Sequence, residues 1–226
     1  MFCLLTYQTP LIPRAAWTLL IVLSLCPSAG CEGDAHRGGG AGAEFKTRDG
    51  VVILSDAQPD SEGLYPDLPQ IQPGEIVMES GEPGSADRER AAAVLDLLRE
   101  LVAMLDREDL SGLPELVSRE KGLYVDLKAH QTRDWVIADL RKPTGYIHTH
   151  YLNTAGLRQR TEEESQLAVR DILRLTRLLT ADVYLQEDGL QCELRLRLED
   201  APSKSYYLNN PVFIYENDRW LIYRLI

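Results

Sequence analysis

The sequence predicts an α+β fold in which N-terminal helices pack on a curved, mainly antiparallel sheet that ends in a four-strand meander. The main observation is an alternation near the C-terminus, where leucines and Cys192 occupy one parity of residues 190–198 and polar or charged residues the other. Such alternation places one parity on a buried sheet face and the other in solvent. Upstream, residues 85–106 carry apolar side chains at helical spacing. An antiparallel sheet with one buried face needs such a layer to cover it.

Four helices are predicted, over residues 85–106, 111–119, 133–142 and 163–179. Each has apolar residues that recur every three or four positions, as on the buried side of an amphipathic helix. Ser85 and Thr132 are suitable N-cap residues for the first and third helices. Pro114 is tolerated in the first turn of the second helix, and Pro143 ends the third.

Strands are predicted over residues 123–127, 145–152, 183–185, 190–199, 205–215 and 219–225. The Asp188-Gly189 pair favours a tight hairpin turn before the leucine-rich strand. The last two strands are joined across residues 216–218. Together the final four strands make the predicted meander, and the helices before them are expected to cover its leucine face.

The N-terminal residues have the pattern of a targeting segment. Arg14 is followed by an apolar run over residues 15–25, which is too short to span a bilayer comfortably and fits the core of a signal peptide. Residues 1–30 are therefore predicted to be a signal peptide.

The residues at the end of this segment suggest a lipid attachment site at Cys31. The run from Ser28 to Cys31 resembles a bacterial lipobox, in which the cysteine is acylated and the chain is cut just before it. Ser28 stands where a leucine is usual, and relaxed lipoboxes of this kind resemble those of spirochaetes. Secretion without a lipid and an uncleaved membrane anchor are the alternatives.

Residues 31–84 are predicted to be a flexible tether that is rich in glycine, proline and acidic residues. Its low hydrophobicity cannot offset the entropy cost of ordering it. Two short apolar runs, 51–54 and 76–78, are exceptions. Each is either an added strand of the domain or a partner-binding peptide. Residues 85–226 then form the single α+β domain.

Charge and cysteine content exclude several classes of function. The formal net charge of −11 would repel phosphate backbones, so nucleic acid is not expected as a partner. With the first three cysteines in the signal peptide or at its end, Cys192 has no disulfide partner. It lies on the leucine parity, where a thiol behaves as a small buried apolar group.

Three side chains are candidates for a pocket or a metal site: Asp126, His148 and His150. On a strand, the two histidines would point to one face, and two such ligands need a third from elsewhere. His130 or Asp126 is the candidate for that third ligand, but surface histidines are the commoner explanation. The chain has no glycine-rich phosphate loop, nucleophile elbow or zinc-protease motif, and we expect no bound cofactor.

The predicted element order resembles the nuclear transport factor 2-like fold, a curved sheet wrapped over helices to form a cone. The resemblance covers about residues 86–226, and cystatin-like folds of other connectivity are the alternative. The runs 121–128, 210–214 and 220–225 resemble a family of leptospiral lipoproteins, which implies an envelope location without an established activity. Isomerases and dehydratases of the cone fold place a carboxylate or histidine inside the cone.

The sequence therefore predicts an exported cell-envelope protein, anchored by a lipid on the periplasmic face or the surface. Its domain is expected to bind or scaffold an unknown protein or small molecule without catalysis. Seven tyrosines could line a cone pocket, at positions 124, 146, 151, 184, 206, 207 and 223. The competing hypothesis is an isomerase- or dehydratase-type enzyme that acts on a small apolar ligand there, with Asp126 or His148 as acid or base. A purely structural envelope component is a third possibility.

Overall fold

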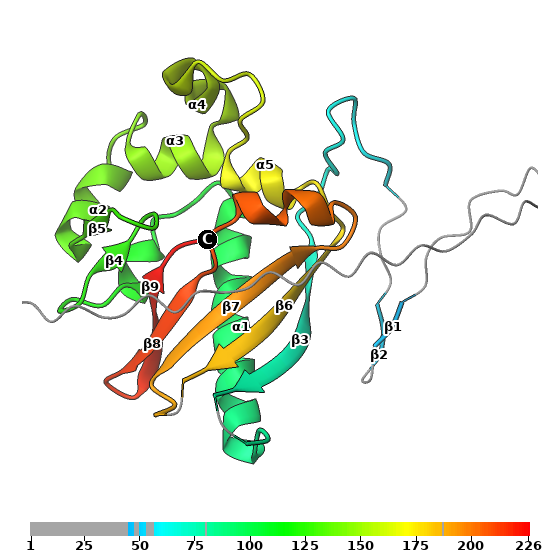
Figure 1. The fold of residues 1–226 in the computed structure, drawn as a ribbon. Coiled ribbons are helices and arrows are strands. Elements are labelled where there is room, and N and C mark those ends of the chain that lie inside the picture. Colours follow the sequence, from blue (N-terminus) through cyan, green and yellow to red (C-terminus); the bar gives the residue numbers. More distant parts are fainter. Residues whose placement is uncertain (1–44, 48–49, 53–56, 80, 187) are drawn as a thin grey trace, which may run out of the picture. The chain divides into compact units, whose positions relative to one another are not determined.

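A seven-stranded mixed sheet forms the centre of the computed structural model (Figure 1), which confirms the α+β class. The structure describes residues 45–47, 50–52, 57–79, 81–186 and 188–226. The predicted signal peptide and Cys31 lie outside these residues. Within the described ranges, no helix combines the length and the apolar character needed to cross a membrane.

The strand order in the main sheet is β3-β6-β7-β8-β9-β4-β5. Neighbours from β6 to β9 are antiparallel, whereas β3 pairs with β6, and β4 with β9, in parallel. The strands are β3 (Gln70–Met78), β4 (Leu123–Tyr124), β5 (His130–Gln131), β6 (Leu178–Leu185), β7 (Gln191–Leu198), β8 (Val212–Glu216) and β9 (Arg219–Arg224). A separate antiparallel pair is formed by β1 (Phe45–Thr47) and β2 (Gly50–Val52).

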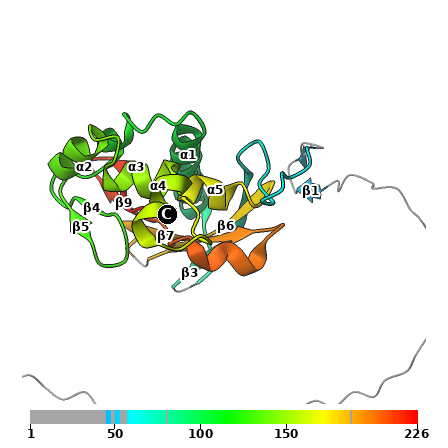
Figure 2. The ribbon, with the colours of Figure 1, turned by 90° about the horizontal axis from the view of Figure 1, so that it is seen from above.

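The longest helix, α1, packs against β3, β6 and β9 of the main sheet. Shorter helices gather at one end of the sheet (Figure 1). When the molecule is seen from above, α3, α4 and α5 lie between α1 and the segment η2 (Figure 2). The helical elements are α1 (Ser85–Asp106), η1 (Leu113–Leu116), α2 (Arg133–Leu140), α3 (Tyr146–Leu152), α4 (Thr154–Thr161), α5 (Val169–Leu173) and η2 (Pro202–Tyr207). Of these, η1 and η2 are 3₁₀ helices.

The leucine row of β7 is the inner wall of the sheet, as its alternation predicts. Cys192, Leu194 and Leu198 are fully buried and Leu196 nearly so, in the same core cluster as the apolar face of α1. Leu190 stands at the hairpin just before β7 and is 51% exposed. The Asp188-Gly189 turn forms with Gly189 at φ +65°, a conformation that glycine adopts without strain.

The charged parity of β7 forms cross-strand pairs on the opposite face. Arg197 pairs with Asp182 of β6, and the Arg224 guanidinium lies 3.3 Å from the Glu193 carboxylate. The Thr180 hydroxyl donates to Glu199. Two of these contacts join β6 to the neighbouring strand β7 or to the residue just after it, and the third, between Glu193 and Arg224, passes β8 to reach β9. Such contacts across the sheet account for the charge pattern through sheet stabilisation.

The predicted tether boundary at residue 84 is wrong, because the ordered domain begins before residue 85. β3 pairs with β6 from Gln70 to Met78, although its register shifts after Pro73. Leu64 is only 6% exposed, and the Tyr65 N–H donates to the Arg174 carbonyl at 2.7 Å. The run 76–78 is therefore part of an added strand, one of its two predicted alternatives.

The helix predicted over residues 163–179 is also wrong. Only Val169–Leu173 are helical, as α5, and β6 begins at Leu178. Lying between β3 and β7, β6 has seven of its eight residues buried. In the sequence, Ile172, Leu173 and Leu175 are followed closely by Leu178 and Leu179, and periodicity alone does not show where such an apolar stretch changes from helix to strand.

The strand predicted over residues 145–152 is a helix instead, α3. Its first two N–H groups, of Tyr146 and Ile147, donate to the Asp139 carboxylate at 3.0 and 2.8 Å. This carboxylate at the end of α2 satisfies donors that a helix start leaves free. A side chain on Gly145 would not fit, since its Cβ would lie 2.4 Å from the Asp139 carbonyl oxygen.

Three other elements are shorter than expected. The region 111–119 contains only the 3₁₀ turn η1, and the strand expected over 123–127 stops at Tyr124. Residues 205–207 belong to η2, so β8 begins at Val212. The helix α1 has the expected span, but its N-cap is Gly84, whose N–H donates to the Asp87 carboxylate.

Candidate functional site

A cavity of about 850 Å³ opens at the end of the sheet where the short helices gather. Its walls come from the turn after β4, from α3, α4 and α5, and from η2. Its apolar lining residues include Val125, Leu157, Val169, Ile172 and Leu175. Its polar lining includes Asp126, Tyr146 and His150. The structure thus brings Asp126 and His150 together, two of the three predicted site residues.

Asp126 is positioned by the turn that joins β4 to β5. Its Oδ1 accepts hydrogen bonds from the N–H groups of Lys128 and Ala129, both at 2.7 Å. The Tyr146 hydroxyl donates to Oδ2 at 3.3 Å. The Lys128 hydrogen bond lowers the pKa of Asp126 most, and the Ala129 and Tyr146 bonds add to this against the opposing effect of burial. The carboxylate is therefore ionised at neutral pH and is a weak proton acceptor.

Tyr146 and His150 stack one helical turn apart on α3. Their ring centroids are 4.0 Å apart with an interplanar angle of 22°. Burial, together with Asp126, raises the pKa of Tyr146 to about 12, so the phenol keeps its proton. Burial and the nearby Arg160 lower the pKa of His150 against the opposing effect of Asp126. At neutral pH the imidazole is therefore uncharged.

His148 lies elsewhere, and the expectation that both histidines share a face is wrong. On a helix, residues two positions apart point to different sides. His148 lines a second cavity of about 380 Å³ beside the end of α1 and α2. His130 is near neither histidine, and its Nε2 lies 2.6 Å from the Lys121 carbonyl oxygen. No group of three or more potential ligand side chains that could hold a metal ion occurs among the described residues.

Tyr151 is a buried lining residue whose hydroxyl contacts the main chain beside the cavity. Its side chain is 3% exposed, and its hydroxyl lies 3.3 Å from the Val125 carbonyl oxygen and 3.0 Å from the main-chain oxygen of Ile226. It thereby links α3 to the segments that follow β4 and β9. Burial raises the pKa of Tyr151 well above its ordinary value, so this donor does not titrate in the neutral range.

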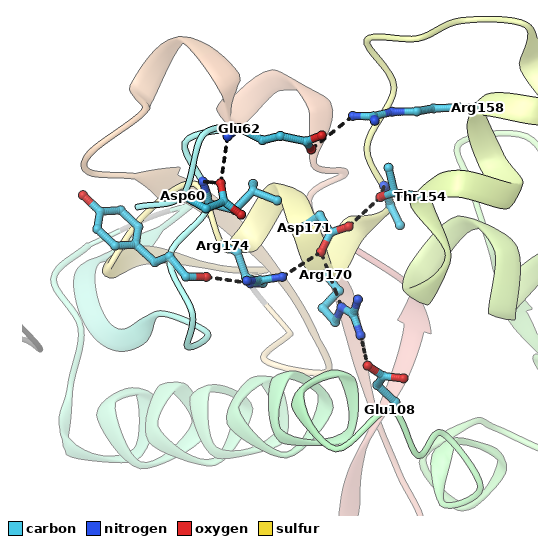
Figure 3. A network of polar contacts seen from close by, with 11 residues as sticks. Asp60, Glu62, Glu108, Thr154, Arg158, Arg170, Asp171 and Arg174 are labelled. Carbon is cyan, nitrogen blue, oxygen red and sulfur yellow. Dashed lines mark hydrogen bonds and ion pairs between the residues drawn. The ribbon is translucent and has the colours of Figure 1, made fainter. Parts of the chain in front are cut away.

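A polar network fastens the segment around residue 62 to the helices beside the cavity (Figure 3). The Glu62 carboxylate, a lining group, lies 3.6 Å from the Arg158 guanidinium of α4. The Arg174 Nε donates to the Tyr65 carbonyl at 2.6 Å. The buried Asp171 accepts a hydrogen bond of 2.6 Å from the Thr154 hydroxyl, and so links α5 to α4.

The expected tyrosine lining is only partly present. Tyr146, Tyr151 and Tyr207 line the cavity, whereas Tyr184 and Tyr206 are exposed on the surface. Tyr124 and Tyr223 form an edge-to-face pair with ring centroids 5.3 Å apart. The space between α1 and the sheet, where a cone pocket was expected, contains the buried leucine core.

Glu62 and Arg158 are site residues that the sequence reasoning missed. Glu62 lies in the region predicted to be a tether, and Arg158 lies within a helix, α4, that was not predicted. Neither residue belongs to a sequence motif that would mark it as part of a site. Their proximity arises only because residues 57–79 fold back onto the domain.

The two residues expected to act as acid or base are poorly suited to proton transfer in this cavity. Asp126 is ionised and already accepts two main-chain hydrogen bonds, and His148, the other residue proposed as acid or base, lines a different cavity. Comparison with protein-family models, curated proteins and solved structures found no match. The geometry of the site is therefore the basis for assigning a function.

Proposed function

We propose that this chain is an exported, lipid-anchored cell-envelope protein whose domain binds a small, largely apolar molecule in the cavity bounded by α3, α4 and α5. Binding in this proposal is non-catalytic. The predicted lipid on Cys31 provides the contact with the membrane, and nucleic acid is not a partner.

The cavity is the observation that supports the binding activity. Its volume of about 850 Å³ lies in the range of small-molecule sites, which combine apolar walls with a few polar groups that fix orientation. Leu157 and Ile172 are among the apolar lining residues, and Asp126 and His150 are among the polar ones. A ligand with an apolar body and one polar end matches this lining.

The envelope location rests on the sequence alone. Arg14, the apolar run over 15–25 and the lipobox-like residues before Cys31 support export and acylation. The proposed kinship with leptospiral lipoproteins rests on the runs 121–128, 210–214 and 220–225. The proposed nuclear transport factor 2-like fold now rests on α1 and the strands β6 to β9, because the elements at 145–152 and 163–179 differ from those that suggested it.

Ligand-detected NMR with octan-1-ol, octylammonium and octanoate tests the binding activity. At least one of these probes is expected to bind saturably to the full chain. Val169→Trp would place an indole in the cavity and is expected to abolish binding. Leu127→Trp is the control, since Leu127 is 67% exposed and outside the cavity lining. Binding of none of the probes, or equal binding to both variants, would overturn the proposal.

Detergent-phase partitioning and mass spectrometry of the mature N-terminus test the anchor. The mature chain is expected to enter the detergent phase and to begin at an acylated Cys31. Cys31→Ser should move the protein to the aqueous phase. An unmodified N-terminus at residue 31 or beyond would refute lipid attachment.

A further inference from the structure

We infer that the ligand of the cavity between α3, α4 and α5 is an organic cation, with an ammonium head at Asp126 and an apolar body against the aliphatic side chains that line the same cavity. This inference rests on the proposed binding function and specifies its ligand class. Three features support it: the free acceptor capacity of Asp126, the excess of carboxylates around the cavity, and the uncharged state of His150.

Asp126 presents a carboxylate oxygen that can accept another hydrogen bond. Its Oδ1 is occupied by the N–H groups of Lys128 and Ala129. Among the described residues, Oδ2 accepts one hydrogen bond, from the Tyr146 hydroxyl at the long distance of 3.3 Å. An ionised carboxylate oxygen has room for further donors, and an ammonium group is a strong donor with the complementary charge.

The other charged groups around the cavity favour a cation over an anion. Four carboxylates line it, those of Glu62, Asp126, Glu163 and Glu164, against the cationic side chains of Arg158 and Lys204. Arg158 lies 3.6 Å from Glu62, so these two charges offset each other. The Lys204 ammonium lies over the Tyr207 ring, 5.4 Å from its centroid. No described basic group forms an ion pair with Asp126.

His150 adds no positive charge to offset the carboxylates around the cavity. Its ring stacks on Tyr146, and its lowered pKa leaves the imidazole neutral at pH 7. Arg160, which contributes to that shift, does not line the cavity and donates to the Thr144 carbonyl at 3.2 Å. The neutral imidazole and the neighbouring Tyr146 ring do not repel an ammonium head at Asp126, and aromatic faces attract cations.

The aliphatic residues of the lining specify the rest of the ligand. Leu157, Val169, Ile172 and Leu175 present aliphatic side chains from α4, α5 and the residues just after α5. Such a wall gains free energy by covering apolar surface and offers no partner to a polar chain. A primary ammonium on an aliphatic or aromatic body therefore matches both kinds of lining group.

The test uses the full chain carrying Cys31→Ser, which removes the predicted acylation site. Octylammonium, octan-1-ol and octanoate share one apolar chain and differ in the charge of the head group. Titration followed by NMR is expected to rank octylammonium first, at least about tenfold tighter than octan-1-ol, as for one charge-assisted hydrogen bond. Added salt should weaken binding of octylammonium and leave that of octan-1-ol unchanged.

Asp126→Asn separates the charge from the structure of the turn. Asparagine keeps an oxygen that can accept the Lys128 and Ala129 hydrogen bonds, so the fold should be retained. Octylammonium affinity is expected to fall about tenfold, to that of octan-1-ol, and octan-1-ol affinity to stay the same. Asp134→Asn, on the exposed side of α2 and away from the cavity lining, is the matched control and should change neither affinity.

The outcomes distinguish this inference from the proposed function. If octan-1-ol and octylammonium bind equally, or octanoate binds best, the cation assignment is wrong while binding in the cavity stands. The assignment also fails if Asp126→Asn leaves the octylammonium affinity unchanged. Failure of all three probes to bind the parent chain overturns the proposed function itself.

Discussion

Truncation of Leu194 tests the assignment of the β7 leucine row to the inner wall of the sheet. Leu194 is fully buried within the core cluster. Leu194→Ala removes buried methyl and methylene groups and leaves a cavity that close-packed neighbours fill only in part. We expect it to lower the free energy of unfolding by about 3 kcal/mol, within the range of about 2–5 kcal/mol for such truncations.

Leu190→Ala is the matched control because it makes the same chemical change on the same residue parity. Leu190 is 51% exposed, so its truncation removes less buried surface and leaves no closed cavity. We expect a loss of about 1 kcal/mol or less.

Urea unfolding followed by far-ultraviolet circular dichroism measures both effects. With a denaturant dependence of about 1–3 kcal/mol per molar urea, Leu194→Ala should lower the midpoint by about 1–3 M. The midpoint of Leu190→Ala should stay close to that of the parent. Equal losses in the two variants, or a larger loss at residue 190, would refute the assignment of this row to the core.

Three further predictions follow from single side chains. Tyr151→Phe removes a donor to two main-chain oxygens and should lower the free energy of unfolding by about 1–2 kcal/mol; an unchanged urea midpoint would contradict this. Burial, with the charge of Glu193, raises the pKa of the Cys192 thiol to about 12, so iodoacetamide at pH 8 should modify Cys192 only after unfolding, as peptide mass spectrometry can measure. Burial raises the pKa of Asp200, but its bonds with Arg177 lower it by more. The ionised Asp200 side chain therefore stabilises the fold at pH values above about 4, the pKa of aspartate in the unfolded chain. This stabilisation is lost as the pH falls through the lower pKa of Asp200 in the folded state. The stability difference between the parent and Asp200→Asn should shrink between pH 6 and pH 3, and a constant difference would contradict the assigned shift.

Local patterns in the sequence correctly predicted the elements that pack against a single apolar surface. The alternation in β7 and the apolar stripe of α1 each face one large apolar surface, so the side-chain period matches the burial pattern. α2 begins after Thr132 as expected, and the Thr132 hydroxyl accepts a hydrogen bond from the Trp135 N–H at 3.2 Å. In these cases the structure is decided by interactions within the element, such as an N-cap, or by burial of one apolar face.

The wrong predictions arose where distant residues decide the local structure. Gly145 to Leu152 alternates like a strand, but the Asp139 carboxylate satisfies the first N–H groups of a helix there. β6 lies between β3 and β7 in the sheet and has seven of its eight residues buried, so it lacks the alternation of buried and exposed positions that would identify it. β3 itself lies in a stretch whose composition suggests disorder, and its pairing with β6 orders it.

The candidate site was predicted in part for the same reason. Asp126 and His150 were named as candidates because carboxylates and imidazoles carry binding chemistry, and they do line one cavity. The walls around them come from segments more than a hundred residues apart, such as Glu62 and Ile172. The spacing of residues in the sequence does not predict that these segments lie together, because their proximity depends on how whole helices pack.

The way in which residues 60–65 are fastened has a mechanical consequence. Force applied along the chain from its N-terminal side passes through this segment before it reaches β3, and here Tyr65 is bonded to Arg174 in both directions and Glu62 lies against Arg158. β3 and the sheet lie further along the chain, and they bear load only after these contacts give way. Since Glu62 lines the cavity, tension on the N-terminal chain would open the binding site before it pulls a strand from the sheet.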